Sequence, residues 1–126
     1  MTVYQKRSKR KVTGGRYLTS EKKRLSNTGS LPAFTKVGPK KVRTKRHKGG
    51  NPANFLLAAD KINVINPKTK KAQVTEVVTV LENSANRNFI RRNIITKGTI
   101  LETKLGKVKV TSRPGQVGTL NGVLIS

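Results

Sequence analysis

The segment from Asn86 to Gln116 constrains this chain most, because it mixes apolar and basic side chains at close spacing. The apolar members that can turn inward are Phe89, Ile90, Ile94 and Ile95. The basic members are Arg87, Arg91, Arg92, Lys97 and Arg113. Charged side chains are costly to bury without partners, so these cations must face solvent or a polyanion. The segment therefore predicts a small apolar body that presents fixed cations, as phosphate recognition requires.

The net charge indicates the same kind of partner. The chain has 28 Lys and Arg against 5 Asp and Glu, a formal charge of +23 over 126 residues. Such a charge opposes compaction unless a polyanion neutralises it, and phosphate backbones do so by releasing condensed counterions. An anionic membrane is the rival partner, but it requires a hydrophobic anchor or a basic amphipathic helix, and neither is evident. We therefore expect nucleic acid and no membrane partner.

Cysteine content and hydropathy exclude several other classes. The sequence has no cysteine, which rules out disulfides and thiolate metal sites and fits a reducing compartment. Its longest apolar run, Phe55–Ala59, is far too short to span a bilayer. The basic N-terminus leads into no apolar stretch, so it does not have the pattern of a secretory signal.

The basic residues concentrate toward the N-terminus. Residues 1–48 hold 16 of the 28 basic residues and a single acid, Glu21. Residues 1–41 show no sustained apolar period and are interrupted by glycine and proline. We predict an extended basic arm over 1–41 that binds a polyanion, with a short helical turn at 20–25 capped by Ser20. A solvated tail is the alternative interpretation.

Short β-like segments follow the arm. Residues 42–46 alternate and predict a basic first strand, whereas the apolar residues 55–58 fit a buried strand or a helical turn. Residues 61–65 and 73–81 predict a hairpin, because Asn66 and Pro67 between them favour a turn. Residues 99–103 and 107–111 predict a second hairpin around Leu105–Gly106.

Three further features complete the predicted body. Asn83 or Ser84 is expected to cap one helical turn through Phe89. Pro114–Gly115 suits a type II turn, and 120–125 predicts a last strand that Asn121–Gly122 bends or bulges. The sequence thus predicts an all-β fold over 42–126, a small barrel or sandwich of about six short strands, with a long basic N-terminal extension.

Catalytic and metal-binding residues are few. The closest acids in sequence, Glu76 and Glu82, would lie about 20 Å apart along a strand, too far for an acid–base pair. His47 is the only histidine and lies among Lys and Arg, so a loop side chain near phosphate is favoured over a general base. We expect no enzyme activity, no metal site and no cofactor.

Residues suited to nucleic-acid binding are abundant. Arginine forks grip phosphate and asparagine amides reach sugar or base edges, whereas Tyr4, Tyr17 and Phe34 of the arm can stack on bases. Phe55 and Phe89 are expected in the core. Without a recognition helix, the composition favours folded RNA, read through backbone and shape. The predicted RNA-binding residues are Lys6, Arg7, Lys9, Arg10, Lys11, Arg16, Lys22, Lys23, Arg24, Lys40, Lys41, Arg43, Lys45, Arg46, His47, Asn86, Arg87, Arg91, Arg92, Lys97 and Arg113.

Several motifs, in order and with similar spacing, resemble the small-subunit ribosomal protein family S8e of archaea and eukaryotes. They are residues 10–16 (RKVTGGR), 49–51 (GGN), 83–87 (NSANR), 93–98 (NIITKG), 110–116 (VTSRPGQ) and 123–125 (VLI). The length is similar to the compact archaeal form. The resemblance implies a β-barrel body and a basic extension threaded into ribosomal RNA (rRNA).

The main hypothesis is a structural constituent of the small ribosomal subunit that binds and compacts small-subunit rRNA in the cytoplasm. Its expected partners are that rRNA and neighbouring small-subunit proteins, without homo-oligomers. The first alternative is an architectural protein that compacts DNA or RNA in general. The second is an enzyme acting on RNA through His47 and lysines, which the shortage of acids disfavours.

Overall fold

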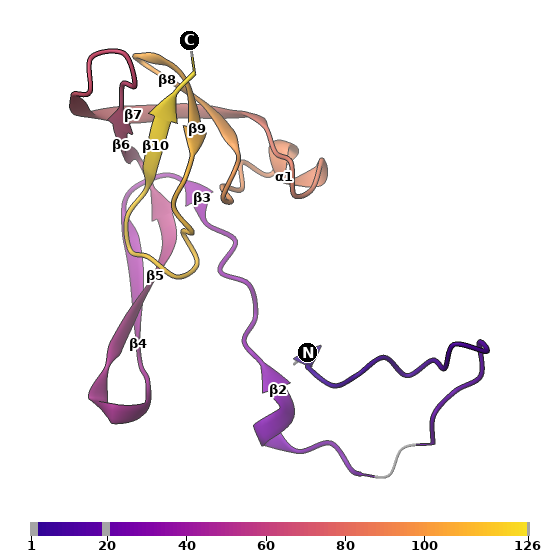
Figure 1. Ribbon diagram of the computed structural model, residues 1–126. Helices are drawn as coiled ribbons and strands as arrows, with labels where there is room; N and C mark the ends of the chain where they lie inside the picture. The colour runs from indigo at the N-terminus through magenta and orange to yellow at the C-terminus, as the bar shows by residue number, and fades with distance from the viewer. Residues whose placement is uncertain (1–2, 19–20, 126) are drawn as a thin grey trace. The chain divides into compact units, whose positions relative to one another are not determined.

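The computed structural model describes residues 3–18 and 21–125, and contacts within the chain divide it into two units, Met1–Pro32 and Ala33–Ser126. Ten strands lie in the described residues, together with one short α-helix and two 3-10 helices (Figure 1). The predicted all-β class is confirmed. Sequence reasoning expected fewer strands because β1 (Val3–Tyr4), β2 (Thr28–Gly29) and β3 (Lys36–Val37) have two residues each, too few to show a period.

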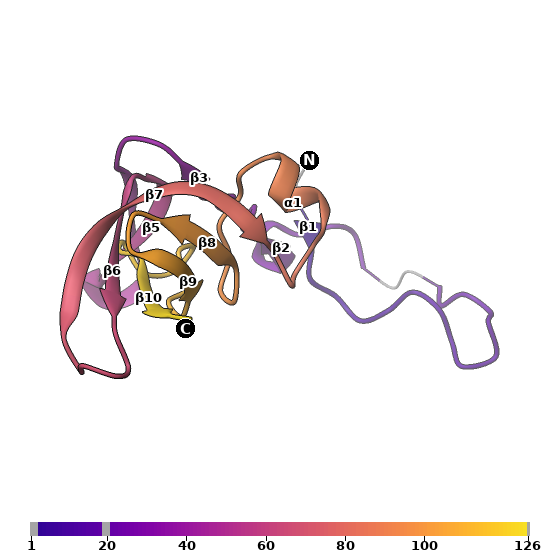
Figure 2. The same ribbon diagram turned by 90° about the horizontal axis from the view of Figure 1, so that it is seen from above.

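A closed barrel forms the body of the second unit, with the strand order β10-β6-β7-β8-β9. Its strands are β6 (Lys61–Ile65), β7 (Ala72–Glu82), β8 (Ile100–Thr103), β9 (Gly106–Val110) and β10 (Asn121–Leu124). β6–β7 and β8–β9 are antiparallel hairpins, as predicted. β10 closes the barrel because it pairs in parallel with β6 and antiparallel with β9. Figure 2 shows the long strand β7 curving along the barrel wall.

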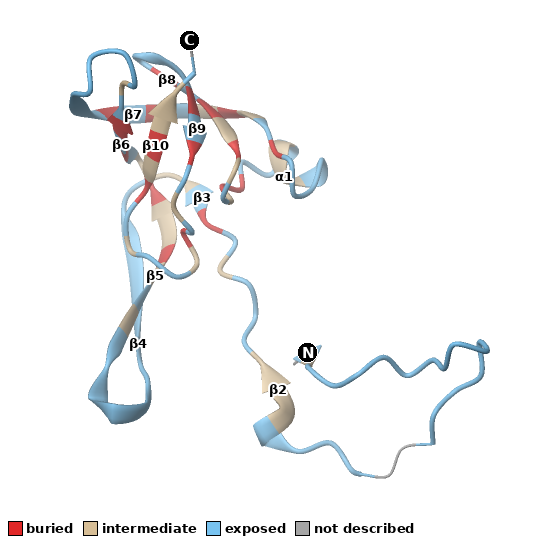
Figure 3. Cartoon of the chain, viewed as in Figure 1, coloured by how far each residue is buried: buried red, intermediate tan, exposed pale blue. Residues whose placement is uncertain are grey.

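Alternate side chains of the barrel strands fill its interior, which Figure 3 shows as the main cluster of buried residues. The cluster includes Ile62, Val64, Val77, Val80, Leu101, Val108, Val110 and Leu120. Gly122 lets β10 approach β9, because a Cβ there would lie 2.5 Å from Val108 Cγ1 and 2.9 Å from the Lys109 carbonyl oxygen. The bulge that the sequence offered at this glycine, as one of two alternatives, is wrong, since the register of β10 is unbroken.

A basic hairpin extends from the barrel in the second unit. β4 (Lys41–Arg46) pairs antiparallel with β5 (Pro52–Ala59), and β3 pairs in parallel with the end of β5 (Figure 1). The structure settles the choice at 55–58 in favour of a strand. Every residue of β4 is exposed, whereas β5 becomes buried toward Leu56 and Ala59, so the hairpin is anchored only at its base.

Two predicted local details are wrong. α1 (Asn88–Arg91) begins after Arg87, and neither Asn83 nor Ser84 caps it, because the Asn83 side chain bonds instead to Ala85, Ile94 and Thr96. Pro114–Gly115 forms a turn in which the Arg113 carbonyl accepts from the N–H groups of both Gln116 and Val117. The φ of Gly115 lies outside the positive range that the third position of a type II turn requires, so the turn is not type II.

The first unit is held together by few contacts. β1 pairs antiparallel with β2, and Arg10 bridges to Arg16 across a tight turn in which Gly14 has φ +84°. A 3-10 helix lies at Leu25–Asn27, later than the helical turn expected at 20–25, whose cap Ser20 lies outside the described residues. Within 3–18 and 21–125, no helix is long and apolar enough to cross a membrane.

Candidate nucleic-acid interface

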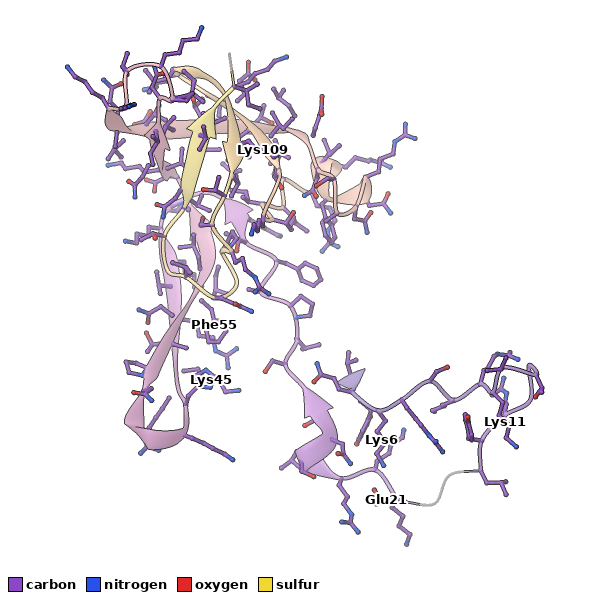
Figure 4. All side chains as sticks on the ribbon, in the orientation of Figure 1. Lys6, Lys11, Glu21, Lys45, Phe55 and Lys109 are labelled. Carbon is purple, nitrogen blue, oxygen red and sulfur yellow. The ribbon has the colours of Figure 1, made fainter. Side chains whose placement is uncertain are left out.

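All 28 Lys and Arg side chains belong to exposed residues. Ion pairs in the part of the chain that the structure describes join only Lys6 to Glu21, at 3.1 Å, and Lys104 to Glu76. Figure 4 shows both partners of the first pair. Almost the whole positive charge is therefore left unneutralised by the protein itself, and a polyanion can reach it.

The predicted arginine cluster, Arg87, Arg91 and Arg92, lies in the segment that follows β7. Arg87 precedes α1, Arg91 ends it, and Arg92 follows, all exposed. The Asn86 Oδ1 accepts a 2.9 Å hydrogen bond from the Asn88 N–H, so this amide oxygen shapes the turn that precedes α1. The expectation that Ile94 and Ile95 turn inward is confirmed, since both are buried.

A buried polar network holds this cluster in place. Asn83 Nδ2 donates to the Ile94 carbonyl at 3.1 Å, while its Oδ1 accepts from the Ala85 N–H at 2.9 Å and from Thr96 Oγ1 at 3.1 Å. The Thr96 N–H donates to Thr99 Oγ1 at 3.0 Å. Satisfied buried networks rigidify their surroundings. Lys97 therefore sits in a turn of fixed geometry, and so do both ends of the arginine-bearing segment.

Phe34 lies beside this cluster and not in the first unit, although the sequence placed it in the arm. Its ring packs edge-on against Phe89, with centroids 5.8 Å apart and an interplanar angle of 73°. The Arg92 guanidinium carbon lies 5.8 Å from the Phe34 centroid. The prediction that Phe55 and Phe89 belong to the core is wrong, because both are only half-buried and pack outside the barrel interior.

The β4–β5 hairpin presents a second basic surface. One face of the hairpin carries Arg43, Lys45 and His47, which alternate along the chain. Phe55 lies opposite Arg43 on the same face, and its ring is 6.4 Å from the His47 ring. Figure 4 labels Phe55 and Lys45 on this hairpin. At the tip, Gly49 and Gly50 both have positive φ and no side chain to bar a close approach.

Among the remaining predicted cations of the second unit, Arg46 is exposed near the hairpin tip, opposite Pro52, whereas the others lie near the hairpin base. Lys40 and Lys41 lie where the chain enters β4, and Arg113 precedes Pro114, whose carbonyl accepts from the Leu56 N–H at 2.9 Å. Lys36 and Lys48, which are not among the predicted residues, are also exposed on β3 and at the tip. The dense run of basic residues from 36 to 48 is the sequence signal that includes them.

The first unit carries the other predicted cations. The Arg7 guanidinium lies 3.9 Å and the Lys11 ammonium 5.6 Å from the Tyr17 ring centroid, and Lys23 lies 5.4 Å from that of Tyr4. Arg10 donates to the Gly14 carbonyl at 3.2 Å and pairs with Arg16 across the turn. The like charges of Arg10 and Arg16 repel one another across the turn, and an anion bound between them would lower this repulsion.

Acidic side chains are too dispersed for catalysis. Glu76 is bound by the Lys104 ammonium, whose hydrogen bond and charge lower the pKa of this exposed carboxyl below its usual 4.5. Within 3–18 and 21–125, no three His, Asp or Glu side chains gather as a metal site would need. The surface is built to bind anions.

Comparison with known proteins gives a consistent result. The family model described as "Ribosomal protein S8e" matches residues 4–125. The chain is 49% identical over 125 residues to "Small ribosomal subunit protein eS8" of Methanobrevibacter smithii, covering 99% of this chain and 100% of that one. Proteins of the same name are 48% identical in Nanoarchaeum equitans (97% and 96% covered) and 44% identical in Sulfolobus acidocaldarius (99% and 98% covered).

Proposed function

The chain belongs to the ribosomal protein S8e family, and from this premise we propose that it binds and compacts small-subunit rRNA by recognising the RNA backbone and shape. The family assignment makes it a structural, non-enzymatic component of the small ribosomal subunit, acting in translation in the cytoplasm. The RNA-binding surfaces and the protein neighbours are the parts we propose.

One observation carries the proposal: among the residues that the structure describes, almost all the exposed cations are without an acidic partner. Each phosphate that a Lys or Arg neutralises releases condensed counterions, which supplies affinity without reading sequence. The protein holds +23 and neutralises little of it internally. Small-subunit rRNA supplies phosphates at the density that such a surface needs, and close approach of RNA helices becomes possible where the cations lie between them.

The rigidity of the second unit allows its cations to recognise the shape of the RNA as well as its charge. The arginine cluster rests on the network of Asn83, Thr96 and Thr99, and the hairpin carries its cations on a defined strand face. Fixed cations fit one arrangement of phosphates better than another. We propose that the cations of the first unit make a second group of contacts with the RNA. The free energy of RNA binding offsets the conformational entropy that this part of the chain loses when it becomes ordered.

The experiment compares two double variants that each remove two positive charges. Arg91→Ala with Arg92→Ala changes the proposed surface, whereas Lys68→Ala with Lys70→Ala changes the β6–β7 turn at the opposite end of β7 (Figure 1). We expect the first to reduce incorporation into small subunits with the barrel still folded, and the second to incorporate normally. Equal incorporation of the two variants contradicts a specific role for the cluster.

A further inference from the structure

Two features of Phe34 are each unfavourable for the stability of the fold. The residue is 41% exposed, although its side chain is large and apolar. Its backbone has φ +45°, in the left-handed region that bulky L-residues rarely adopt. Such strain persists only where the surrounding structure imposes it, and it concentrates at functional sites.

The surrounding structure does impose it. Thr35, the next residue, is buried, and its Oγ1 donates to the Leu56 carbonyl at 2.6 Å. The Thr35 carbonyl accepts from the Ile95 N–H at 2.8 Å, and the Val37 N–H donates to the Asn93 carbonyl at 3.3 Å. These bonds fix the backbone beside α1. The Phe34 ring thus starts from a fixed backbone, and it packs against Phe89 in a T-shaped contact while the residue stays partly exposed.

The ring lies in a strongly cationic setting. The Arg92 guanidinium lies 5.8 Å from its centroid, near the outer limit of a cation–π contact, so the arginine is loosely held there. Arg91 is the adjacent residue, and Arg87 precedes the same short helix. A flat, exposed aromatic ring among arginines matches a nucleotide, which offers a planar base and a phosphate together.

We propose that Phe34 is a base-binding site, on which one unpaired base of small-subunit rRNA stacks while Arg92 grips a phosphate of that nucleotide. The inference rests on the proposed rRNA binding and adds to it a contact that is not electrostatic. An unpaired base in a loop or bulge is required, because a base within an RNA helix has no free face. The strained backbone holds the ring in its stacking position before RNA arrives.

The test measures the affinity of the full chain for small-subunit rRNA as a function of salt. Phe34→Leu keeps an apolar contact with Phe89 but removes the flat ring. We expect it to bind about 5-fold to 150-fold more weakly, the effect of losing one stacked base, with an unchanged slope of log affinity against log salt. Phe34→Trp, which keeps an aromatic face, is expected to bind within about 2-fold of the unaltered chain. Arg92→Ala should instead make the slope shallower by about one.

A second measurement does not depend on variants. Ultraviolet cross-linking of the unaltered chain to small-subunit rRNA should yield a peptide that carries a nucleotide at Phe34. Equal affinity of Phe34→Leu and the unaltered chain, with no cross-link at Phe34, overturns the base-binding site. The proposed function still stands in that case if the unaltered chain prefers small-subunit rRNA to random RNA. If Phe34→Leu binds rRNA normally but fails to enter subunits, the ring contacts a protein neighbour and the base-binding site is rejected.

Discussion

Thr96 Oγ1 donates a 3.1 Å hydrogen bond to the Oδ1 atom of Asn83, and this bond joins the two ends of the segment that carries the arginine cluster. Asn83 follows β7 and Thr96 precedes β8, so the intervening chain leaves the barrel and returns to it at one place. The arginines of this segment are exposed, whereas its base is held by a satisfied polar network.

Replacing Asn83 tests the importance of this link. Asn83→Ala removes the side-chain partner of the Ala85 N–H and of the Ile94 carbonyl and leaves the Thr96 hydroxyl only its bond to Thr99, and we expect it to lower the free energy of unfolding by about 1–3 kcal/mol. Hydrogen exchange of the Ala85 amide should also accelerate. Asn88→Ala, at an exposed position of α1, serves as control and should change stability by less than about 0.5 kcal/mol. Equal stabilities of the two variants contradict the role of the network.

Gly122 is predicted to tolerate no side chain. In Gly122→Ala the new Cβ meets Val108 and the Lys109 carbonyl, and since a backbone atom cannot move cheaply we expect overpacking of about 1–3 kcal/mol. Gly115→Ala is the matched control, because its Cβ would meet only the Ala33 Cβ at an ordinary 3.7 Å. Urea unfolding of both variants measures the difference, and a Gly122→Ala chain as stable as Gly115→Ala refutes the close approach of β10 to β9.

The strain at Phe34 has its own consequence for stability. Both Phe34→Ala and Phe34→Gly remove the ring, but only glycine relieves the left-handed backbone, so Phe34→Gly should be more stable than Phe34→Ala by about 1 kcal/mol. At Val74, an exposed position within strand β7, the order should reverse, with the alanine variant more stable. Equilibrium unfolding of the four variants checks this, and the same order at both sites means that Phe34 is unstrained.

The Glu76–Lys104 pair gives a pH prediction. The Lys104 hydrogen bond and charge lower the pKa of Glu76 in the folded chain, so the pair stabilises the fold above the usual carboxyl pKa of 4.5 and loses this effect as the pH falls through the lowered pKa. In Lys104→Met the pKa of Glu76, followed by NMR, should rise toward 4.5. Because both side chains are exposed, added salt should reduce the difference. An unchanged pKa shows that the pair is not formed in solution.

The barrel strands could be predicted from the sequence because their apolar residues alternate, as Ile62 and Val64 of β6 do. The turn between β6 and β7 could be predicted as well, because asparagine favours turns by bonding its own backbone; here the Asn66 Oδ1 accepts from the Lys68 N–H at 3.0 Å. Closure of the barrel was not predictable, since the parallel pairing of β10 with β6 joins segments far apart in the chain.

The surroundings of the arginine cluster were predicted only in part. The arginines of the cluster could be predicted from their charge alone. The place of Phe34 beside them could not, because residues 35–37 pair with Asn93–Ile95, which are distant in the chain, and such pairing leaves no pattern in the local sequence. Asn83 was expected at a helix cap, since a capping residue and a buried network residue look alike in sequence. Tertiary contacts decided both.

The most direct test of the central claim is the binding of the chain to small-subunit rRNA, to random RNA of equal length and to duplex DNA over a salt titration. Neutralising about 6–10 phosphates should weaken all three by roughly three to five decades between 50 and 200 mM salt. We expect small-subunit rRNA to remain clearly the tightest ligand at the higher salt, because the fixed cations recognise its shape. If the three polyanions lose affinity together and none is preferred, charge alone explains binding, and the protein is a general nucleic-acid-compacting protein instead.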